Sequence, residues 1–369
     1  MTTHKTLYQI ALTCIPGVGV AHARNLMKAV GDAEAIFNEK AGSLEKIQGI
    51  SRRLIHEIRR AEVLQKAEKE LEFVEKNHIE TLFFTQENYP SRLNDCIDAP
   101  VLLYAKGNAH FNAKKVVSIV GTRNATKYGQ EFCQKFIQEL SGLFPDILIV
   151  SGLAYGIDIC AHRASLQNNV STVGVMAHGL DRIYPSVHRA TAKEMLGKGA
   201  LITEFPSDTT PDKFNFVKRN RVVAGMADAV VVIESDEKGG SLITADIANS
   251  YYREVFALPG RATDPKSSGC NNLIAGNKAV LLQNVAGFLN QMGWNATAKS
   301  LPPKQKELFL NLTETEEKVF DALNQVESMH VNMLGIELNI PVSELFFTLL
   351  ELEMKNVVKA LPGGVYKLL

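Results

Sequence analysis

Short runs of β-branched apolar residues recur along the middle of the chain. Each run is followed by a Gly-containing loop and then by a segment with helical spacing. The first two runs, Val116–Val120 and Ile147–Val150, stop at Gly121 and at Ser151-Gly152. Continuous apolar runs of this length are typical of parallel strands that are buried on both faces. Their alternation with helical segments predicts an α/β fold with a doubly wound, mostly parallel sheet.

The rest of the central region repeats this alternation. We predict strands at 116–120, 147–150, 171–177, 200–203, 229–234, 254–258 and 279–282. We predict helices at 127–142, 155–167, 186–197, 215–226, 241–252 and 284–292. Residues 79–105 predict a strand, a short helix and another strand that extend the same sheet. Loops that follow the carboxyl ends of such strands converge on one edge, where open α/β sheets bind ligands.

The first 75 residues read as a separate helical domain. Two stretches, Ile15–Val20 and Ile47–Ser51, have the layout of a helix-hairpin-helix turn, in which Gly allows close approach to a phosphate. Such turns bind DNA backbones without reading sequence. Residues 1–75 carry 11 Lys or Arg and 10 Asp or Glu, so their charge does not separate this interpretation from a plain helical interaction domain.

The C-terminal part predicts a winged helix after a linker at 293–312, which contains Pro302-Pro303 and a Lys-rich run. Residues 313–369 show three helical stretches, then two strands around Pro362-Gly363-Gly364. They carry four Lys and nine Asp or Glu, whereas a DNA-reading helix needs cations that replace counterions at phosphates. We therefore expect a protein-interaction or regulatory role here. The central domain then spans 76–292.

Composition narrows the class of protein further. A chain of 369 residues suggests two or three domains. Its 40 Lys or Arg balance 40 Asp or Glu, so a polyanion would have to be held by a local cluster of cations. The five Cys show no Cys-x-x-Cys pair, which fits reduced thiols in a cytoplasmic protein. No apolar run reaches the roughly 18 residues of a membrane span, and the N-terminus lacks the layout of a signal peptide.

Cationic residues gather in loops at the predicted strand ends. The loop Gly121–Thr126 offers backbone N–H groups, hydroxyls and the planar fork of Arg123, which suits a phosphate. The alternative is a tight turn with an Arg salt bridge. This loop is not Gly-x-Gly-x-x-Gly, and the chain has no Gly-x-x-x-x-Gly-Lys-Ser/Thr. We therefore expect neither a dinucleotide cofactor nor a P-loop ATPase.

Residues 213–221 hold four cations and no acid, with Phe214 and Phe216 between them. Cations that track a backbone and rings that stack on bases suit single-stranded nucleic acid. The alternative is a solvated helix start whose Phe side chains enter the core. Further along, Gly239-Gly240-Ser241 opens a helix that Ser241 caps in our interpretation, and its N–H groups would accept an anion.

Gly152 and Gly156 give the loop Ser151–Asp158 a wider range of backbone conformations. Asp158 and His162 are four residues apart on one helix face, and we expect an ion pair or hydrogen bond between them with a structural role. His162, His178 and His188 have no metal-ligand spacing, so no metal site is predicted.

Together these motifs resemble the DprA/Smf family of bacterial DNA-processing proteins. The resemblance rests on Ile119–Thr126 with Tyr128-Gly129, Ser151–Asp158 with Ala161-His162, Gly179–Asp181 with Tyr184-Pro185, Arg219–Arg221 with Ala224-Gly225, Gly240–Ala245, and Pro259-Gly260. The helix-hairpin-helix-like start and the winged-helix end match common flanks of that family. The resemblance implies an extended Rossmann domain that binds single-stranded DNA and forms a homodimer. It also implies loading of a RecA-type recombinase onto incoming strands during natural transformation, with no enzymatic activity and no cofactor.

Combined with the resemblance, the loops predict one set of DNA contacts. They are Thr122, Arg123, Asn124, Lys127, Ser151, Gly152, Phe214, Phe216, Lys218, Arg219, Asn220, Arg221, Gly240 and Ser241. Two positions depart from the family pattern. Many members have a Gly-x-Gly-Leu-Asp run where this chain has Ala177-His178-Gly179-Leu180-Asp181, so the backbone approach near His178 differs. His188 stands where many have Asn, and it offers a pH-dependent contact.

Two other functions compete with DNA binding. Rossmann relatives with Gly-rich phosphate loops hydrolyse the N-glycosidic bond of nucleoside monophosphates, which requires a positioned carboxylate. Asp158, Asp181 and Glu204 are the candidates, and each has a structural alternative. The third function is a pure interaction scaffold, for which changes at Arg219 and Arg221 would leave DNA affinity unchanged.

Overall fold

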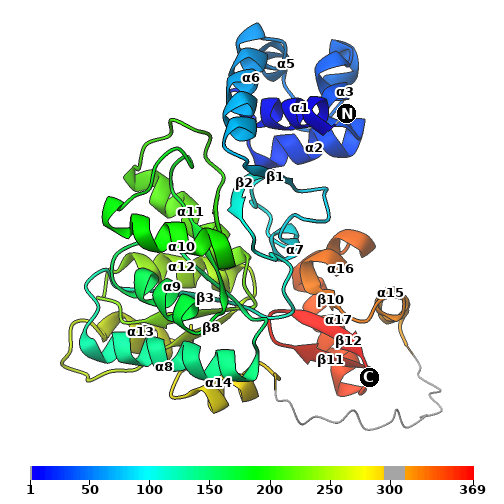
Figure 1. Ribbon diagram of the computed structural model, residues 1–369. Coiled ribbons are helices and arrows are strands. Elements are labelled where there is room, and N and C mark those ends of the chain that lie inside the picture. The colour runs from blue at the N-terminus through cyan, green and yellow to red at the C-terminus, as the bar shows by residue number, and fades with distance from the viewer. Residues whose placement is uncertain (1, 295–311) are drawn as a thin grey trace.

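The computed structural model describes residues 2–294 and 312–369. A helical N-terminal region, a central α/β domain and a C-terminal winged helix follow one another along the chain (Figure 1). The linker predicted at 293–312 falls almost entirely outside the described residues.

The central domain is built on a nine-stranded sheet. The strands are β1 (Glu80–Phe83), β2 (Leu102–Gly107), β3 (Val116–Gly121), β4 (Leu148–Ser151), β5 (Ser171–Val175), β6 (Ala200–Thr203), β7 (Ala229–Ile233), β8 (Glu254–Ala257) and β9 (Val280–Leu281). Their order in the sheet is β1-β2-β6-β5-β4-β3-β7-β8-β9. Strands β3 to β9 pair with one another in parallel. The two antiparallel pairings are those of β1 with β2 and of β2 with β6. The predicted mostly parallel, doubly wound sheet is confirmed.

The direction of winding reverses between β3 and β7. From β3 the chain adds β4, β5 and β6 on one side, and it then returns to add β7, β8 and β9 on the other side. At such a switch point the connecting loops diverge to opposite faces and leave a crevice beyond the carboxyl ends of the strands.

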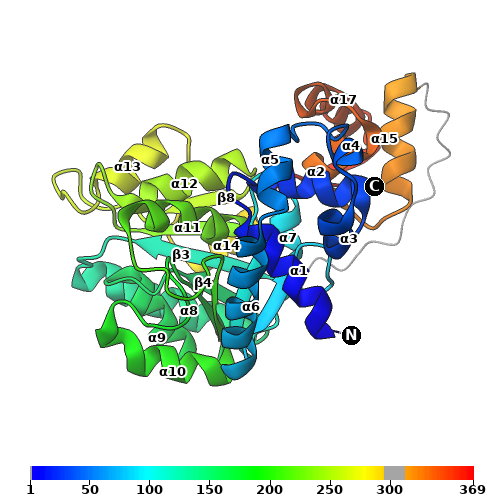
Figure 2. The same ribbon diagram turned by 90° about the horizontal axis from the view of Figure 1, so that it is seen from above.

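Helices cover both faces of this sheet (Figures 1 and 2). One face carries α8 (Lys127–Leu143), α9 (Ile157–Gln167), α10 (Arg189–Lys198, after the 3-10 turn Ser186–His188) and α14 (Val285–Gln291). The other carries α11 (Lys213–Gly225), α12 (Gly240–Ser250) and α13 (Ser268–Ala275). The alternation of side chains along β3 explains this: Val117 and Ile119 pack under α8 and α9, whereas Val116 and Val120 pack under α11 and α12.

The N-terminal region is helical, as predicted. It contains α1 (Thr2–Cys14), α2 (Val20–Val30), α3 (Ala33–Asn38), α4 (Ala41–Leu44), α5 (Arg52–Ile58) and α6 (Ala61–Lys76). The two Gly-containing stretches form the turns between α1 and α2 and between α4 and α5, and Gly17 and Gly49 have positive φ angles of 77° and 82°. Phe83 and Leu102 share one core with these helices, so the region packs on β1 and β2.

The C-terminal domain is the predicted winged helix. It contains α15 (Glu314–Asn324), β10 (Met329–His330), α16 (Val331–Leu338), α17 (Val342–Met354), β11 (Val358–Leu361) and β12 (Val365–Leu368). Thr313 and Glu316 form a reciprocal capping box at α15. The domain lies beside the short helix α7 (Ser91–Asn94) of the central domain (Figure 1). The side chain of Asn332 donates a 2.9 Å hydrogen bond to the backbone oxygen of Asp95.

Among the described residues, no single helix has both the length and the hydropathy of a membrane span. The pair α16 and α17 meets the test only in combination, and the two helices are bent by 109° relative to each other.

Candidate nucleic-acid interface

A cavity of about 880 Å³ lies where β3, β4 and β7 end, next to the switch point of the sheet. Its walls come from the loops after these three strands, from Tyr184, from α11 and from the start of α12. Nine of the predicted DNA contacts line it: Thr122, Arg123, Asn124, Gly152, Phe216, Arg219, Asn220, Gly240 and Ser241. The structure therefore brings together segments that are more than 100 residues apart in the sequence.

The loops around the cavity are fixed to one another by Glu234. This residue is buried at the end of β7 with a positive φ of 54°. Its backbone oxygen accepts a 2.7 Å hydrogen bond from Thr122, and its carboxylate accepts a 2.8 Å bond from the backbone N–H of Thr126 and a further bond from the Thr126 hydroxyl. Gly156 adjoins the same loop with a φ of 75°, and a Cβ there would overlap the Thr122 carbonyl.

Three cationic side chains at the cavity have no acidic partner among the described residues. Arg123, Lys213 and Lys238 are exposed, and none takes part in an ion pair with residues in 2–294 or 312–369. Lys213 and Lys238 were not among the predicted contacts. The neighbouring acid Asp236 is paired with Lys266 at 3.1 Å. Asp212, whose carboxylate accepts a 2.8 Å hydrogen bond from the Phe214 N–H, also lines the cavity, so the rim has an excess of positive charge with three such cations against this one acid.

Arg219 forms part of the cavity floor rather than its rim. It is only 5% exposed, and its Nη1 donates to the backbone oxygens of Gly152, at 2.7 Å, and of Val175. Burial lowers the pKa of Arg219, and the nearby Asp158 opposes that shift. Burial likewise raises the pKa of Asp158, against the attraction of Arg219. The Arg219 guanidinium thereby joins the chain at the end of β4 to the end of β5.

Lys218 and Arg221 lie outside the cavity, although both were predicted DNA contacts. The buried guanidinium of Arg221 donates to the Glu204 carboxylate and to the Asp98 backbone oxygen. Lys218 pairs with the same Glu204 at 3.0 Å. These two cations are therefore engaged in internal ion pairs, and the composition of residues 213–221 overstates the positive charge available to a ligand.

The aromatic residues of this segment separate in the same way. The Phe216 ring lines the cavity, with its centroid 5.9 Å from that of Tyr184 and 5.4 Å from the guanidinium carbon of Arg123. The Phe214 ring lies outside the lining and is 81% exposed. Phe216 therefore belongs to a group of cationic and aromatic side chains that line the cavity, whereas Phe214 is exposed to solvent outside it.

The N-terminus of α12 opens on the cavity without a side-chain cap. Its N-cap is Gly239, and Ser241 instead donates from its hydroxyl to the Ser235 hydroxyl at 2.9 Å. The prediction that Ser241 caps this helix is therefore wrong, because the helix begins at Gly240 and Ser241 lies within its first turn. A Cβ at Gly240 would meet nothing within 4 Å, so the approach to the first-turn N–H groups is open.

Other expectations for individual residues also need correction. Asp158 accepts a hydrogen bond from the Ala154 N–H, whereas His162 contacts the Thr172 hydroxyl at 2.7 Å, so the predicted Asp158–His162 pair does not form. The helix turns the imidazole towards β5 and the carboxylate towards the cavity. Ser151 is buried and donates to the Ile119 backbone oxygen at 2.6 Å, which leaves it outside the lining.

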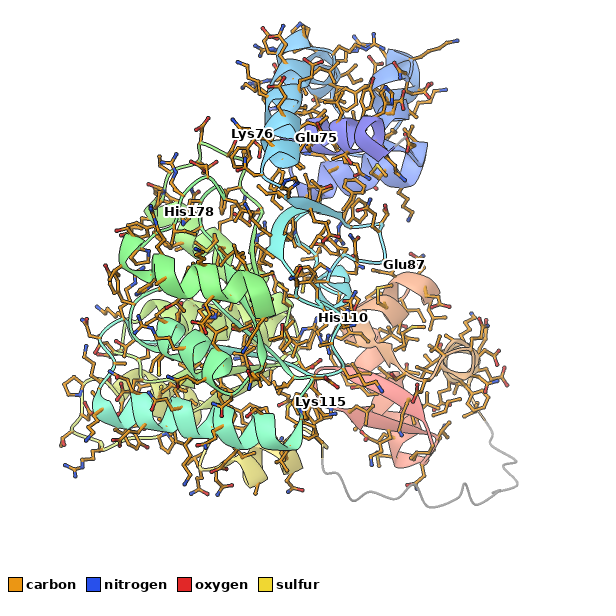
Figure 3. The ribbon with its side chains drawn as sticks, viewed as in Figure 1. Glu75, Lys76, Glu87, His110, Lys115 and His178 are labelled. Carbon is orange, nitrogen blue, oxygen red and sulfur yellow. The ribbon has the colours of Figure 1, made fainter. Side chains whose placement is uncertain are left out.

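The remaining positions lie away from the cavity. Lys127 is exposed at the start of α8 and faces Glu131 at 3.5 Å. His178, labelled in Figure 3, is buried in the loop after β5. His188 is buried and contacts the Leu153 backbone oxygen at 2.8 Å, so it does not offer the predicted contact with a ligand.

Only one of the three carboxylates considered for hydrolysis reaches the cavity. Asp158 lines it, Asp181 pairs with Arg182 at 2.5 Å, and Glu204 is held by Lys218 and Arg221. Within 2–294 and 312–369, no group of three or more His, Cys, Asp or Glu side chains is arranged to hold a metal ion.

Comparison with known proteins adds independent information. Residues 80–293 match the family model for DNA recombination-mediator protein A, and residues 301–364 match the DprA winged helix domain. Protein Smf of Escherichia coli is 34% identical over 289 residues, which cover 76% of this chain and 75% of that protein. The DNA processing protein DprA of Streptococcus pneumoniae is 41% identical over 186 residues, or 50% of this chain and 65% of that protein.

Two solved structures are also similar. The X-ray structure of DNA processing protein A from Streptococcus pneumoniae aligns with a TM-score of 0.62 and 31% identity, covering 78% of this chain and 98% of that chain. The structure of DNA processing protein A from Helicobacter pylori, described for its single-stranded DNA binding mode, aligns with a TM-score of 0.52 and 31% identity. It covers 57% of this chain and 94% of that chain.

Proposed function

Because the chain belongs to the DprA/Smf family, that of DNA recombination-mediator protein A, we propose that it binds single-stranded DNA in the cavity at the switch point of its central sheet. The observation that carries this proposal is the set of unpaired cations, Arg123, Lys213 and Lys238, around an aromatic floor. The Helicobacter pylori relative of similar fold is described as a single-stranded DNA binder, which supports the same ligand here.

The backbone of the strand would follow the cationic rim. Free guanidinium and ammonium groups replace counterions at phosphates. The open N-terminus of α12 adds N–H donors and the positive end of the helix dipole, and Gly240 leaves room for a phosphate to approach them. Lys238 precedes this helix, Arg123 belongs to the loop after β3, and both line the cavity.

A base would stack on the aromatic floor. The Tyr184 and Phe216 rings line the cavity, and stacking tolerates any base because every base has a π face. A base in a duplex is already stacked on its neighbours, so this platform favours unpaired strands. Arg219 would act indirectly, because its guanidinium holds the Gly152 carbonyl in position beneath the ligand.

The biological role that fits this binding is protection of incoming single strands and loading of a RecA-type recombinase during natural transformation. We extend the proposal to a homodimer formed through the central domain and to action in the cytoplasm. No catalytic step is part of it. Asp158, the hydrolase candidate that lines the cavity, has its carboxylate engaged by the Ala154 N–H and by the charge of Arg219.

Fluorescence anisotropy with a labelled dT oligonucleotide and with a duplex of equal length tests the DNA proposal. The protein should bind the single strand more tightly than the duplex, and Phe216→Ala should weaken single-strand binding. Equal affinity for both, or no binding at low salt, would overturn it. An assay for base release from nucleoside monophosphates, run on the same preparation, then tests the hydrolase alternative.

A further inference from the structure

The second helix of the helix-turn-helix unit, α17, has an apolar stripe on its outer face. Phe347, Leu350 and Met354 follow one another at intervals of three and four residues, and their exposed fractions are 74%, 55% and 77%. At 100° per residue they fall within about 60° around the helix axis. The opposite face buries Leu345, Leu349 and Leu352 in the domain core, so α17 is apolar on two sides but packed on only one.

Acidic side chains flank this stripe on both sides. Glu344 and Glu351 follow one edge of the helix, and Glu353 follows the other. Neither Glu344 nor Glu351 forms an ion pair with any residue in the described parts of the chain, and both are exposed. The nearest lysine along the chain, Lys355, is bound to Glu316 at 2.6 Å. The outer face is therefore apolar in the middle and negative at its margins.

A recognition helix needs cations that meet phosphates, and α17, Val342–Met354, contains no Lys or Arg. The wing is turned towards the central domain: Gly364 lies so close to Tyr252 that a Cβ on it would come 2.9 Å from the Tyr252 Cβ. The Phe346 ring also packs on Tyr252, with a centroid distance of 5.4 Å.

The inter-domain contact leaves the stripe bare. Phe346 is half-buried on the flank of α17 that meets Tyr252, and the stripe residues are turned roughly 40 to 100° away from it around the helix. Figure 2 shows the winged helix beside the central sheet with α17 at the edge of the molecule. A contiguous exposed apolar surface with a polar rim is typical of a protein-binding site.

We propose that the outer face of α17 is a docking site for a basic amphipathic helix of a partner protein, in which Lys or Arg flank the apolar positions. An apolar helix face laid against another helix is a common recognition mode, and the glutamates select partners of opposite charge. A second copy of this chain fits less well, because it would bring both sets of glutamates together. Residues 313–369 carry four Lys against nine Asp or Glu, a net charge of −5.

Peptide binding to the full chain tests this proposal. Two labelled 18-residue amphipathic peptides would share one Leu stripe, with Lys flanking it in the first and Glu in the second. The Lys peptide should bind and the Glu peptide should not. Phe347→Ser with Leu350→Ser should weaken binding by about tenfold or more, as truncation of central apolar anchors does. Leu143→Ser, a change of an exposed Leu that is 54% exposed on α8, is the matched control and should have no effect.

Charge-reversal variants distinguish specific binding at this site from non-specific hydrophobic binding. Glu344→Lys with Glu351→Lys should weaken the Lys peptide and let the Glu peptide bind. Circular dichroism would show that both double variants keep their fold, since all four side chains are exposed. Equal binding of both peptides, or binding that the Phe347 and Leu350 changes leave intact, would overturn the proposal.

Two other occupants are distinguishable outcomes that would also overturn it. If Phe347→Ser shifts the mass of the protein in solution from dimer to monomer, a second copy occupies the face. If a Gly-Ser replacement of residues 295–311 is needed before the Lys peptide binds, that segment of the chain occupies it. The proposal does not depend on DNA binding in the central domain, since the peptide assay contains no nucleic acid.

Discussion

Removal of the three unpaired cations at the cavity should change how DNA affinity depends on salt. The variant carries Arg123→Gln, Lys213→Gln and Lys238→Gln. All three side chains are exposed and form no ion pair with the described residues, so the changes leave the fold intact. For single strands, each neutralised phosphate contributes about 0.7 to the slope of log affinity against log salt. Three such contacts therefore contribute about 2 to this slope.

The magnitude follows from that slope. A fourfold rise in salt, from about 50 to 200 mM, weakens the wild type roughly 18-fold more than it weakens the variant if all three cations meet phosphates. The assay is fluorescence anisotropy with a labelled dT oligonucleotide at four or five salt concentrations. The slope is the informative quantity, because loss of folded protein would lower the active fraction without altering the counterions released per bound strand.

A matched variant controls for net charge. Lys114→Gln, Lys193→Gln and Lys359→Gln remove the same three charges from exposed positions that do not line the cavity. This control should keep the wild-type slope. If both variants lose the same slope, the protein binds DNA through its overall field and the cavity is not the site. If neither loses slope, the strand is held elsewhere.

Three further predictions concern single residues. Arg221→Ala should lower the free energy of unfolding by about 3 kcal/mol in urea, because it breaks a buried ion pair with Glu204, while the DNA salt slope stays unchanged. Burial lowers the pKa of His162 to about 3, whereas in the unfolded chain it lies near 6.5, so the unfolded chain alone binds a proton between these values. The stability due to this residue is therefore complete above pH 6.5 and lost as the pH falls, by about 2 kcal/mol at pH 5, and the stability of His162→Asn should fall less between pH 7.5 and 5. Phe216→Ala should cost about 1–3 kcal/mol of single-strand affinity, and a larger loss for the exposed Phe214→Ala would place the strand outside the cavity.

The strands were predictable because a short run of apolar residues is a local property of the sequence. The run at 200–203 was predicted from its apolar residues alone, and β6 has the same bounds. By contrast, α13 was missed, since Ser268–Ala275 is mostly small and polar and has no clear helical spacing. It forms a helix because Cys270 and Leu273 pack into the core beside β7 and β8. That contact joins residues that are distant in the sequence, so no local sequence pattern indicates it.

The site was only partly predictable, because the sequence does not show which of its charged side chains form internal ion pairs. Residues 213–221 show four cations, but the sequence does not reveal that Glu204 and the Asp98 carbonyl engage Arg221. Lys238, which follows Asp236 and Glu237 in the sequence, was not predicted as a contact. In the folded protein Asp236 pairs with Lys266, and Lys238 forms no ion pair with the described residues. Which charges a ligand meets is thus decided by tertiary partners.

The DNA cavity and the α17 face lie at opposite ends of the central domain. The cavity opens beyond the carboxyl end of β7, at Ser235, whereas the wing contacts Tyr252, just before the amino end of the neighbouring parallel strand β8. A helix on α17 and a strand in the cavity therefore do not compete for space. If the partner is the recombinase itself, this separation lets it be held near the DNA without displacing it. Simultaneous binding of the Lys peptide and dT oligonucleotide, with unchanged affinity for each, is the result this arrangement requires.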